Sequence, residues 1–270
     1  MHFFKTLLSI VSFILGSVFA SFAGVIAYRL PKKISIIKPN SYCPNCQNQL
    51  KAYDKIPLLS WIILGGKCRY CKSKIGILTL LIEIFGGIGF LLSYLQYGDS
   101  FEQLPIFVAN MVMIFLFIII ASIDYETHNI YNFTLWIFAI ISAFITIYRA
   151  IVFEMDIVNH IIGLVFGFLF LGAIKLISNL ILKREGLGAG DVYLVGIAGF
   201  MLGVIPLLIS IFVACIFAII VECIKVKLSK TKIEEEIAFA PYLLLGIGLM
   251  AIYSETIANF YQEVIINAFI

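Results

Sequence analysis

Charged side chains are scarce in this sequence. Only 13% of its 270 residues are Asp, Glu, Lys or Arg, while 62% are hydrophobic. This composition excludes an ordinary soluble globular domain, in which about 25% of residues are charged, and it is typical of a polytopic membrane protein. The chain contains no low-complexity tract and no internal repeat. The net charge of +3 is small, so the overall charge balance says little. We expect no nucleic-acid partner.

Eight apolar stretches are candidates for membrane-spanning helices, which need about 20 residues to cross the hydrocarbon core. They cover residues 6–29, 77–97, 105–123, 131–151, 157–182, 191–203, 205–224 and 237–258. The sixth would extend about 20 Å as a helix, so it must continue past Pro206 at an angle or pack inside the protein. We therefore expect an all-α polytopic membrane protein of about eight transmembrane helices, embedded in a lipid bilayer.

The distribution of Lys and Arg indicates the orientation of the chain, because these residues remain on the cytoplasmic side of a membrane. Ten of the 19 basic residues lie in the segment 29–74, and six more lie in the loops 183–190 and 225–236. With eight spans and an outside N-terminus, all three segments are cytoplasmic. A cleaved signal peptide is the alternative for the N-terminus. It is disfavoured because the apolar run continues to Tyr28 and the basic cluster follows.

Two CxxC pairs separated by 21 residues predict a metal site in the basic segment. Each pair aims two thiolates at one point, and two such turns complete a tetrahedral zinc site whose ligands are Cys43, Cys46, Cys68 and Cys71. Four protein ligands leave no open position, so the zinc would be structural. Two disulfides or a redox CxxC pair are the alternatives, and a cytoplasmic location disfavours structural disulfides. The other two cysteines, Cys215 and Cys223, are interpreted as small core residues.

Two aspartates are predicted to lie at the same depth, at the cytoplasmic membrane boundary. Asp124 ends the third span and Asp191 opens the sixth. Either residue alone would be interpreted as a helix cap or a boundary residue. Together they predict a pair that shares a proton, so that one carboxyl acts as base and the other as acid when water attacks an amide. Helix dipoles predict that Asp191, at a helix start, is the more often charged partner.

A run of glycines precedes the second aspartate in the stretch "GLGAGD". Glycine permits backbone angles that other residues avoid, and it lets an extended substrate strand approach closely. We therefore assign Gly188 and Gly190 to substrate binding. A phosphate-binding loop is disfavoured, because no Lys-Ser/Thr follows and an aspartate there would repel phosphate. Three later glycines would let the following helix pack tightly on a neighbour: Gly196, Gly199 and Gly203.

In this order, the motifs resemble those of the type IV prepilin leader peptidases, a family of GxGD intramembrane aspartic proteases. The resemblance covers nearly the whole chain, from the opening helix "GSVFASFAGVIAYRLP" and the cysteine loop around "IPLLSW" to the late segment "IAFAPYLLLG". "ASIDYETHNIYN" corresponds to the first catalytic aspartate motif and "GLGAGDVYLVG" to the second. The resemblance implies that Asp124 and Asp191 are catalytic.

The resemblance also implies a substrate and a location. The enzyme would cleave the short basic leader from type IV prepilins or pseudopilins, at the cytoplasmic face of the bacterial inner membrane. It would serve type IV pili, type II secretion or competence. The family often methylates the new N-terminus with S-adenosylmethionine, and Glu83 is either a participant by its position or a polar helix–helix contact. The chain would then divide into a first helix (1–30), a zinc-binding loop (31–75) and a peptidase domain (76–270).

This chain departs from the family pattern at three places. Tyr131 stands where the family usually has Pro, Tyr193 where a Lys is common, and "GILTLLIE" lacks the Arg-Tyr-Pro run before the glutamate. None of these changes removes a catalytic carboxylate. The other readings are a GxGD peptidase for a different substrate, a zinc-containing membrane assembly factor without catalysis, and a proton-coupled transporter. A transporter is disfavoured because its acids usually lie near the midplane between repeated halves.

Overall fold

The computed structural model describes residues 2–38, 40–182, 186–229 and 237–269. Within these ranges the chain is helical, with two isolated β-bridges and no sheet. The all-α prediction is therefore confirmed. Six described helices are long and apolar enough to span a bilayer, and two further apolar helices are shorter. The chain is a multi-pass membrane protein, but the predicted count of eight full spans is not confirmed.

Four of the basic residues used to predict the orientation lie outside the described residues: Lys183, Arg184, Lys230 and Lys232. The chain divides into two compact units, Met1–Ile123 and Asp124–Ile270. Each unit is built around its own helices. The predicted domains, 1–30, 31–75 and 76–270, were defined by the function expected of each segment and not by its packing. They stay a prediction.

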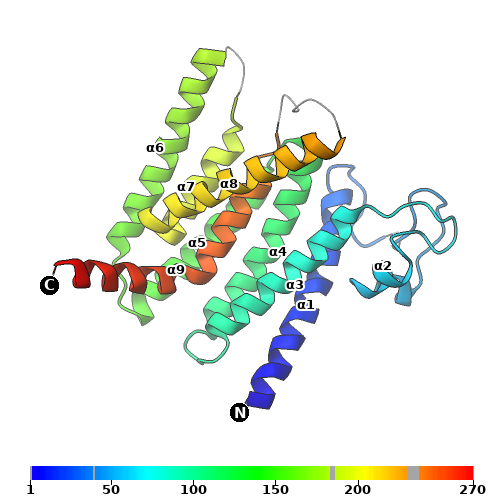
Figure 1. Cartoon of the computed structure of the whole chain (residues 1–270), viewed down its shortest axis with the longest axis horizontal. Coiled ribbons are helices and arrows are strands. Elements are labelled where there is room, and N and C mark those ends of the chain that lie inside the picture. Colours follow the sequence, from blue (N-terminus) through cyan, green and yellow to red (C-terminus); the bar gives the residue numbers. More distant parts are fainter. Residues whose placement is uncertain (1, 39, 183–185, 230–236, 270) are drawn as a thin grey trace. The chain divides into compact units, whose positions relative to one another are not determined.

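The first unit is built on a close helix pair, α1 (His2–Arg29) and α3 (Ile77–Tyr97) (Figure 1). Small residues permit the close approach: a Cβ added to Gly86 would lie 2.8 Å from the carbonyl oxygen of Gly16. Small residues at such crossings are typical of helix pairs in membranes. Helix α4 (Leu104–Thr127) joins them through Ile119 and Ile123, which pack against alanines of α1.

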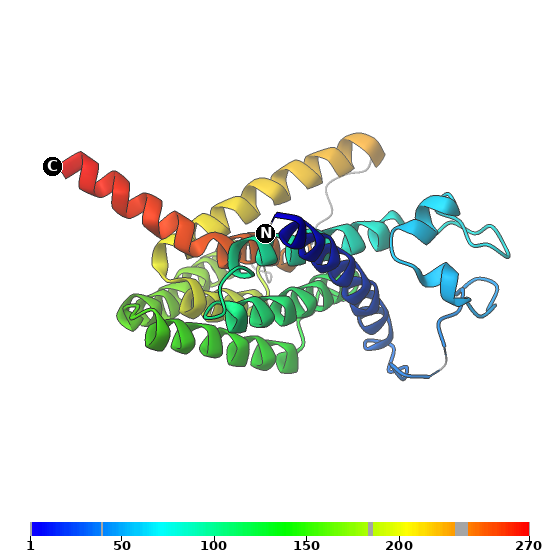
Figure 2. The same cartoon turned by 90° about the horizontal axis from the view of Figure 1, so that it is seen from below.

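The cysteine loop forms a lobe of the first unit, beyond the ends of α1 and α3 that it connects (Figure 2). It contains a short 3-10 helix, η1 (Ala52–Lys55), and one helical turn, α2 (Leu59–Ile63). Neither helix was predicted from the sequence, because each is too short to show the periodic spacing of apolar residues that indicates a helix.

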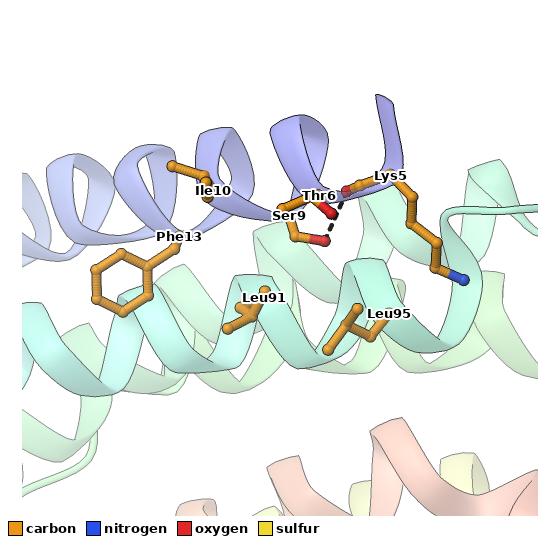
Figure 3. Close-up of a pocket in the computed structure, with 7 residues that line it drawn as sticks. All are labelled: Lys5, Thr6, Ser9, Ile10, Phe13, Leu91 and Leu95. Carbon is orange, nitrogen blue, oxygen red and sulfur yellow. Dashed lines mark hydrogen bonds between the residues drawn. The ribbon is translucent and has the colours of Figure 1, made fainter. Parts of the chain in front are cut away.

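A cavity of about 500 Å³ lies between α1 and α3, near the N-terminal end of α1 (Figure 3). Its lining is mostly apolar, with Lys5, Thr6 and Ser9 at one end. Lys5 also forms an ion pair with Asp99. None of the predicted site residues lines this cavity, so it carries none of the predicted chemistry.

The second unit contains α5 (Asn132–Val152), α6 (Ile157–Leu182), α7 (Ala189–Leu202), α8 (Val204–Ser229) and α9 (Ala240–Phe269). The short α7 contacts each of the other four (Figure 1). It therefore packs inside the unit, which is one of the two options predicted for the sixth apolar stretch. Pro206 lies in the first turn of α8, where its missing N–H removes no helical hydrogen bond.

Glycines bring α6 and α7 into backbone contact. Gly163 of α6 and Gly199 of α7 face each other, and a Cβ on Gly167 would lie 2.7 Å from the carbonyl oxygen of Val195. A Cβ on Gly196 would overlap the ring of Phe168. The predicted tight packing of α7 through its glycines is confirmed.

Polar side chains from the neighbouring helices meet the C-terminal end of α7. The hydroxyls of Ser142 and Thr146 donate to the carbonyl oxygens of Ile197 and Phe200, each at 3.1 Å. The His160 Nδ1 atom lies 2.9 Å from the Phe200 oxygen. Carbonyl groups at a helix end are costly when they lack partners in an apolar environment. Of these contacts, the two at Phe200 satisfy one of the last four carbonyls of this 14-residue helix, which helps it to end inside the unit.

Candidate active site and metal centre

Asp191 lies in the first turn of α7, and its side chain is turned back toward the residue that precedes the helix. Gly188 is that N-cap residue, and its backbone hydrogen-bonds to the Asp191 carboxylate. This is half of a capping box, in which a side chain of the first turn satisfies an N-cap N–H. Asp191 is only 8% exposed. Its Oδ1 atom is buried and has no hydrogen-bond partner among the described residues.

Asp124 lies in the last turn of α4 and is 6% exposed. Its Oδ2 atom accepts a hydrogen bond of 3.3 Å from the backbone N–H of Ala240, the first residue of α9. Pro241 has no N–H, and the N–H groups of Tyr242 and Leu243 bond to the Phe239 oxygen. Of these first-turn residues, Ala240 alone therefore offers its donor to the aspartate.

The fold brings the two predicted catalytic aspartates together from positions 67 residues apart. Asp124 and Asp191 interact electrostatically, and both carboxyls are buried. The helix-dipole argument for Asp191 as the charged partner assumed that Asp124 meets only the end of a helix. That premise is wrong, because Asp124 also meets the N-terminal turn of α9.

The glycines before Asp191 are needed because neighbouring side chains lie too close to leave room for a Cβ, and not because their backbone angles are unusual. Gly188 has φ −63° and ψ 145°, which any residue can adopt, so the predicted reason for a glycine there is wrong. A Cβ on Gly190 would instead lie 2.9 Å from Ile130, and one on Gly188 would lie 3.1 Å from Asp191 Oδ2. The assignment of these glycines to substrate binding stays a prediction.

The four cysteines of the loop form one cluster, as their spacing predicted. Their Sγ atoms, from Cys43, Cys46, Cys68 and Cys71, all lie within 4.8 Å of one another. All six cysteines lie in the described part of the chain and are free thiols, so the disulfide alternative has no support. Four converging thiols match the tetrahedral sulfur site of a structural metal. Cys215 and Cys223 are exposed on α8, so their assignment to the core was wrong.

The two CxxC turns have the same backbone geometry. In the first, the Cys43 N–H donates to Asn48 and the Gln47 N–H donates back to Cys43. In the second, Cys68 pairs in the same way with Ser73 and Lys72. Gln47 and Lys72 have φ values of 59° and 60°. This repeated turn aims both thiols of each pair at the shared point.

Neighbouring groups act unevenly on the cluster: burial and the other thiols raise the pKa of Cys46 to about 11, whereas Ser73 favours the thiolate of Cys71. The Ser73 hydroxyl lies 3.1 Å from Cys71 Sγ and lowers the pKa of that thiol to about 6. A lower pKa favours the thiolate, which is the form that binds a metal. Arg69, inside the second CxxC pair, donates from Nε to Oδ1 of the buried Asp54 at 2.7 Å. That hydrogen bond raises the pKa of Arg69 and ties the turn to η1.

Two further contacts were missed by the sequence analysis. The buried Glu83 accepts a hydrogen bond from the Leu58 N–H at 2.7 Å, so it contacts the cysteine loop rather than another helix. Glu222 accepts a hydrogen bond from the Tyr242 hydroxyl at 2.9 Å. The sequence did show that Glu83 and Glu222 are acidic residues within apolar stretches. It did not show which residue each of them contacts.

Comparison with known proteins decides the family. A model described as "Bacterial Peptidase A24 N-terminal domain" matches residues 14–97, and a model described as "Type IV leader peptidase family" matches residues 111–223. The chain is 31% identical over 251 residues to the prepilin leader peptidase/N-methyltransferase of Bacillus subtilis, covering 93% of this chain and 96% of that protein.

The chain belongs to the type IV leader peptidase family. The predicted family and the prediction of a peptidase are both confirmed. A Myxococcus xanthus protein of the same name is 32% identical, and the match covers 73% of this chain but 57% of that protein. One from Pseudomonas aeruginosa is 24% identical, with 93% of this chain and 92% of that protein covered. No solved structure matches the chain.

Proposed function

We propose that this leader peptidase hydrolyses a peptide bond with water activated jointly by Asp124 and Asp191. The observation that carries the proposal is a pair of buried, interacting carboxyls: Asp191 lies in the first turn of α7, and Asp124 accepts a hydrogen bond from the first turn of α9. Asp124 has a backbone donor that orients it, while Asp191 presents an oxygen with no partner among the described residues. That oxygen is suited to accept a hydrogen bond from the attacking water.

The chemistry requires only the two carboxyl groups. The ionised member takes a proton from water as the water oxygen adds to the carbonyl carbon of the substrate. The protonated member donates to the leaving nitrogen as the carbon–nitrogen bond breaks. Such paired general acid and base catalysis needs neither a metal nor a covalent nucleophile. Gly188 and Gly190 would let the substrate backbone approach beside the pair.

The proposed substrates are type IV prepilins or pseudopilins, which have a basic leader, a Gly at the cleavage site and an apolar helix. The names of the Bacillus subtilis and Myxococcus xanthus relatives support this substrate class. We also propose that the site faces the cytoplasm from the inner membrane, because most basic residues would then lie on the inside. The 1–30, 31–75 and 76–270 division follows from the same proposal.

A metal site and a second activity are also proposed, the first from the cysteine cluster and the second from the names of the relatives. Cys43, Cys46, Cys68 and Cys71 would hold a structural zinc ion, which supplies a cross-link to a loop too small for its own core. The relatives are also named N-methyltransferases, so we propose methylation of the new N-terminus with S-adenosylmethionine. Labelled methyl donor added to purified protein and prepilin tests this: peptide cleavage without label transfer would leave a peptidase only.

The peptidase proposal is tested by replacing each aspartate with asparagine. Asp124→Asn and Asp191→Asn should abolish leader removal when co-expressed with prepilins from the same genome, as read by mass spectrometry of the pilin. Asp156→Asn is the matched control, because Asp156 belongs to the same unit and its carboxylate accepts a hydrogen bond from the Val158 N–H at the exposed start of α6. Normal processing by either of the first two variants would refute the proposed mechanism.

A further inference from the structure

A buried polar contact joins the C-terminal part of α8 to the first turn of α9. Glu222 of α8 is 9% exposed. Its Oε1 atom accepts a hydrogen bond from the Tyr242 hydroxyl at 2.9 Å and another from Lys225 Nζ at 2.7 Å. A carboxylate buried among apolar helices is costly unless it is hydrogen-bonded. Two donors on one oxygen therefore hold Glu222, and through it Tyr242, in one arrangement.

This contact lies two residues from the donor that orients the proposed catalytic aspartate. Tyr242 follows Ala240 in the first turn of α9, and the Ala240 N–H bonds to Asp124. Because Pro241 has no N–H and the next two donors are taken by Phe239, no neighbouring N–H of that turn can replace Ala240. The position of the α9 first turn therefore sets the geometry of Asp124.

The same cluster also reaches the end of α4. The ammonium group of Lys225 lies 5.4 Å from the centre of the Tyr125 ring, and Tyr125 follows Asp124 in the chain. Cation–ring contacts of this length are attractive. Glu222 and Lys225 of α8 thus contact the segments on both sides of the hydrogen bond between Asp124 and Ala240.

We propose that Tyr242 and Glu222 are positioning residues for catalysis. Their hydrogen bond holds the first turn of α9 in place, so that the Ala240 N–H stays directed at Asp124. The inference rests on the proposed function, in which Asp124 helps to activate the water that attacks the substrate peptide bond. Neither residue touches the reacting atoms, so their loss should impair the chemical step rather than substrate binding.

The test uses the purified full-length protein with a prepilin substrate. Tyr242→Phe removes only the hydroxyl, and Glu222→Ala removes its acceptor. Each should lower kcat about 10- to 100-fold with KM unchanged, because small displacements of a catalytic group have effects of this size. Glu222→Gln keeps an acceptor oxygen and should retain most of kcat. Tyr253→Phe, which removes a tyrosine hydroxyl from α9 itself, beyond its first turn, should behave as wild type.

A structural readout accompanies the kinetics. Hydrogen exchange of the peptide covering residues 237–243, followed by mass spectrometry, should be faster in Tyr242→Phe than in wild type and unchanged in Tyr253→Phe. Wild-type kcat in Tyr242→Phe, a change in KM alone, or equal losses in Glu222→Gln and Glu222→Ala would overturn the positioning role. Full activity of Asp124→Asn would instead overturn the proposed function, so the two failures are distinguishable.

Discussion

The carboxylate of Glu83 accepts a hydrogen bond of 2.7 Å from the main-chain N–H of Leu58, which lies in the cysteine loop of the same unit. Leu58 has φ 62° and ψ −55°, and the Leu59 N–H reaches the Pro57 oxygen at 2.6 Å, so the three residues form a γ-turn. A left-handed, non-glycine residue costs about 1–3 kcal/mol and persists only where its surroundings hold it. Glu83 supplies that support from α3.

Removing the Glu83 carboxylate should loosen the cysteine loop. Glu83→Ala leaves the Leu58 N–H without its acceptor, and a hydrogen bond to a charged group contributes about 1.5–3 kcal/mol. We expect faster hydrogen exchange and faster limited proteolysis across residues 51–76, with Glu83→Gln much less affected because it keeps an oxygen. The exposed Glu102 of the same unit provides the control, Glu102→Ala. Equal protection of the loop in wild type and Glu83→Ala would contradict this role.

The cysteine cluster predicts a metal content that can be measured directly. The purified protein should contain about one zinc ion per chain, as expected for a four-cysteine structural site. Cys43→Ser or Cys71→Ser should lose most of it and expose the loop to protease, because metal binding and folding of such a loop are coupled. Cys215→Ser, which changes an exposed thiol of α8, should keep the metal. Full zinc content in Cys43→Ser would exclude the cluster as the site.

The membrane orientation predicts which loops are accessible from outside the cell. Ser100→Cys, between α3 and α4, should react with a membrane-impermeant maleimide in intact cells. Lys38→Cys, in the basic segment after α1, should react only after permeabilisation, because that segment is predicted to be cytoplasmic. The unsubstituted protein measures the background from the native cysteines. The reverse pattern of labelling would invert the proposed orientation and place the aspartate pair on the outer face.

The helices were largely predictable because apolar periodicity and length carry the signal. The stretches predicted at 77–97 and 157–182 coincide with α3 and α6, and the others agree within a few residues at most ends. The larger differences are at three C-terminal ends: α4 continues to Thr127, α8 to Ser229 and α9 to Phe269. At these ends the chain remains helical after the predicted apolar stretch has stopped, so hydropathy alone does not predict where the helix ends.

The chemistry of the site was predictable only in part. Asp124, Asp191 and the four cysteines are unusual residues for their surroundings, and each could be singled out from the sequence. Their supports could not, because each is a contact between distant positions: Ala240 with Asp124, and Leu58 with Glu83. The donor at Ala240 depends on a main-chain N–H, which every non-proline residue has. Only the fold shows where it points.

The contact between α6 and α7 predicts a large difference between two glycine substitutions. In Gly199→Ala the new Cβ would collide with the Gly163 backbone, whereas the space around Gly172 of α6 is open. Overpacking of this kind costs about 1–3 kcal/mol, so Gly199→Ala should unfold at a temperature several degrees below wild type in detergent. Gly172→Ala should match or exceed wild type, because alanine is favoured over glycine within a helix by up to about 1 kcal/mol. Similar midpoints for the two variants would show that α7 can move away from α6, and the buried position of the α7 N-terminus, with Asp191, would then not depend on this contact.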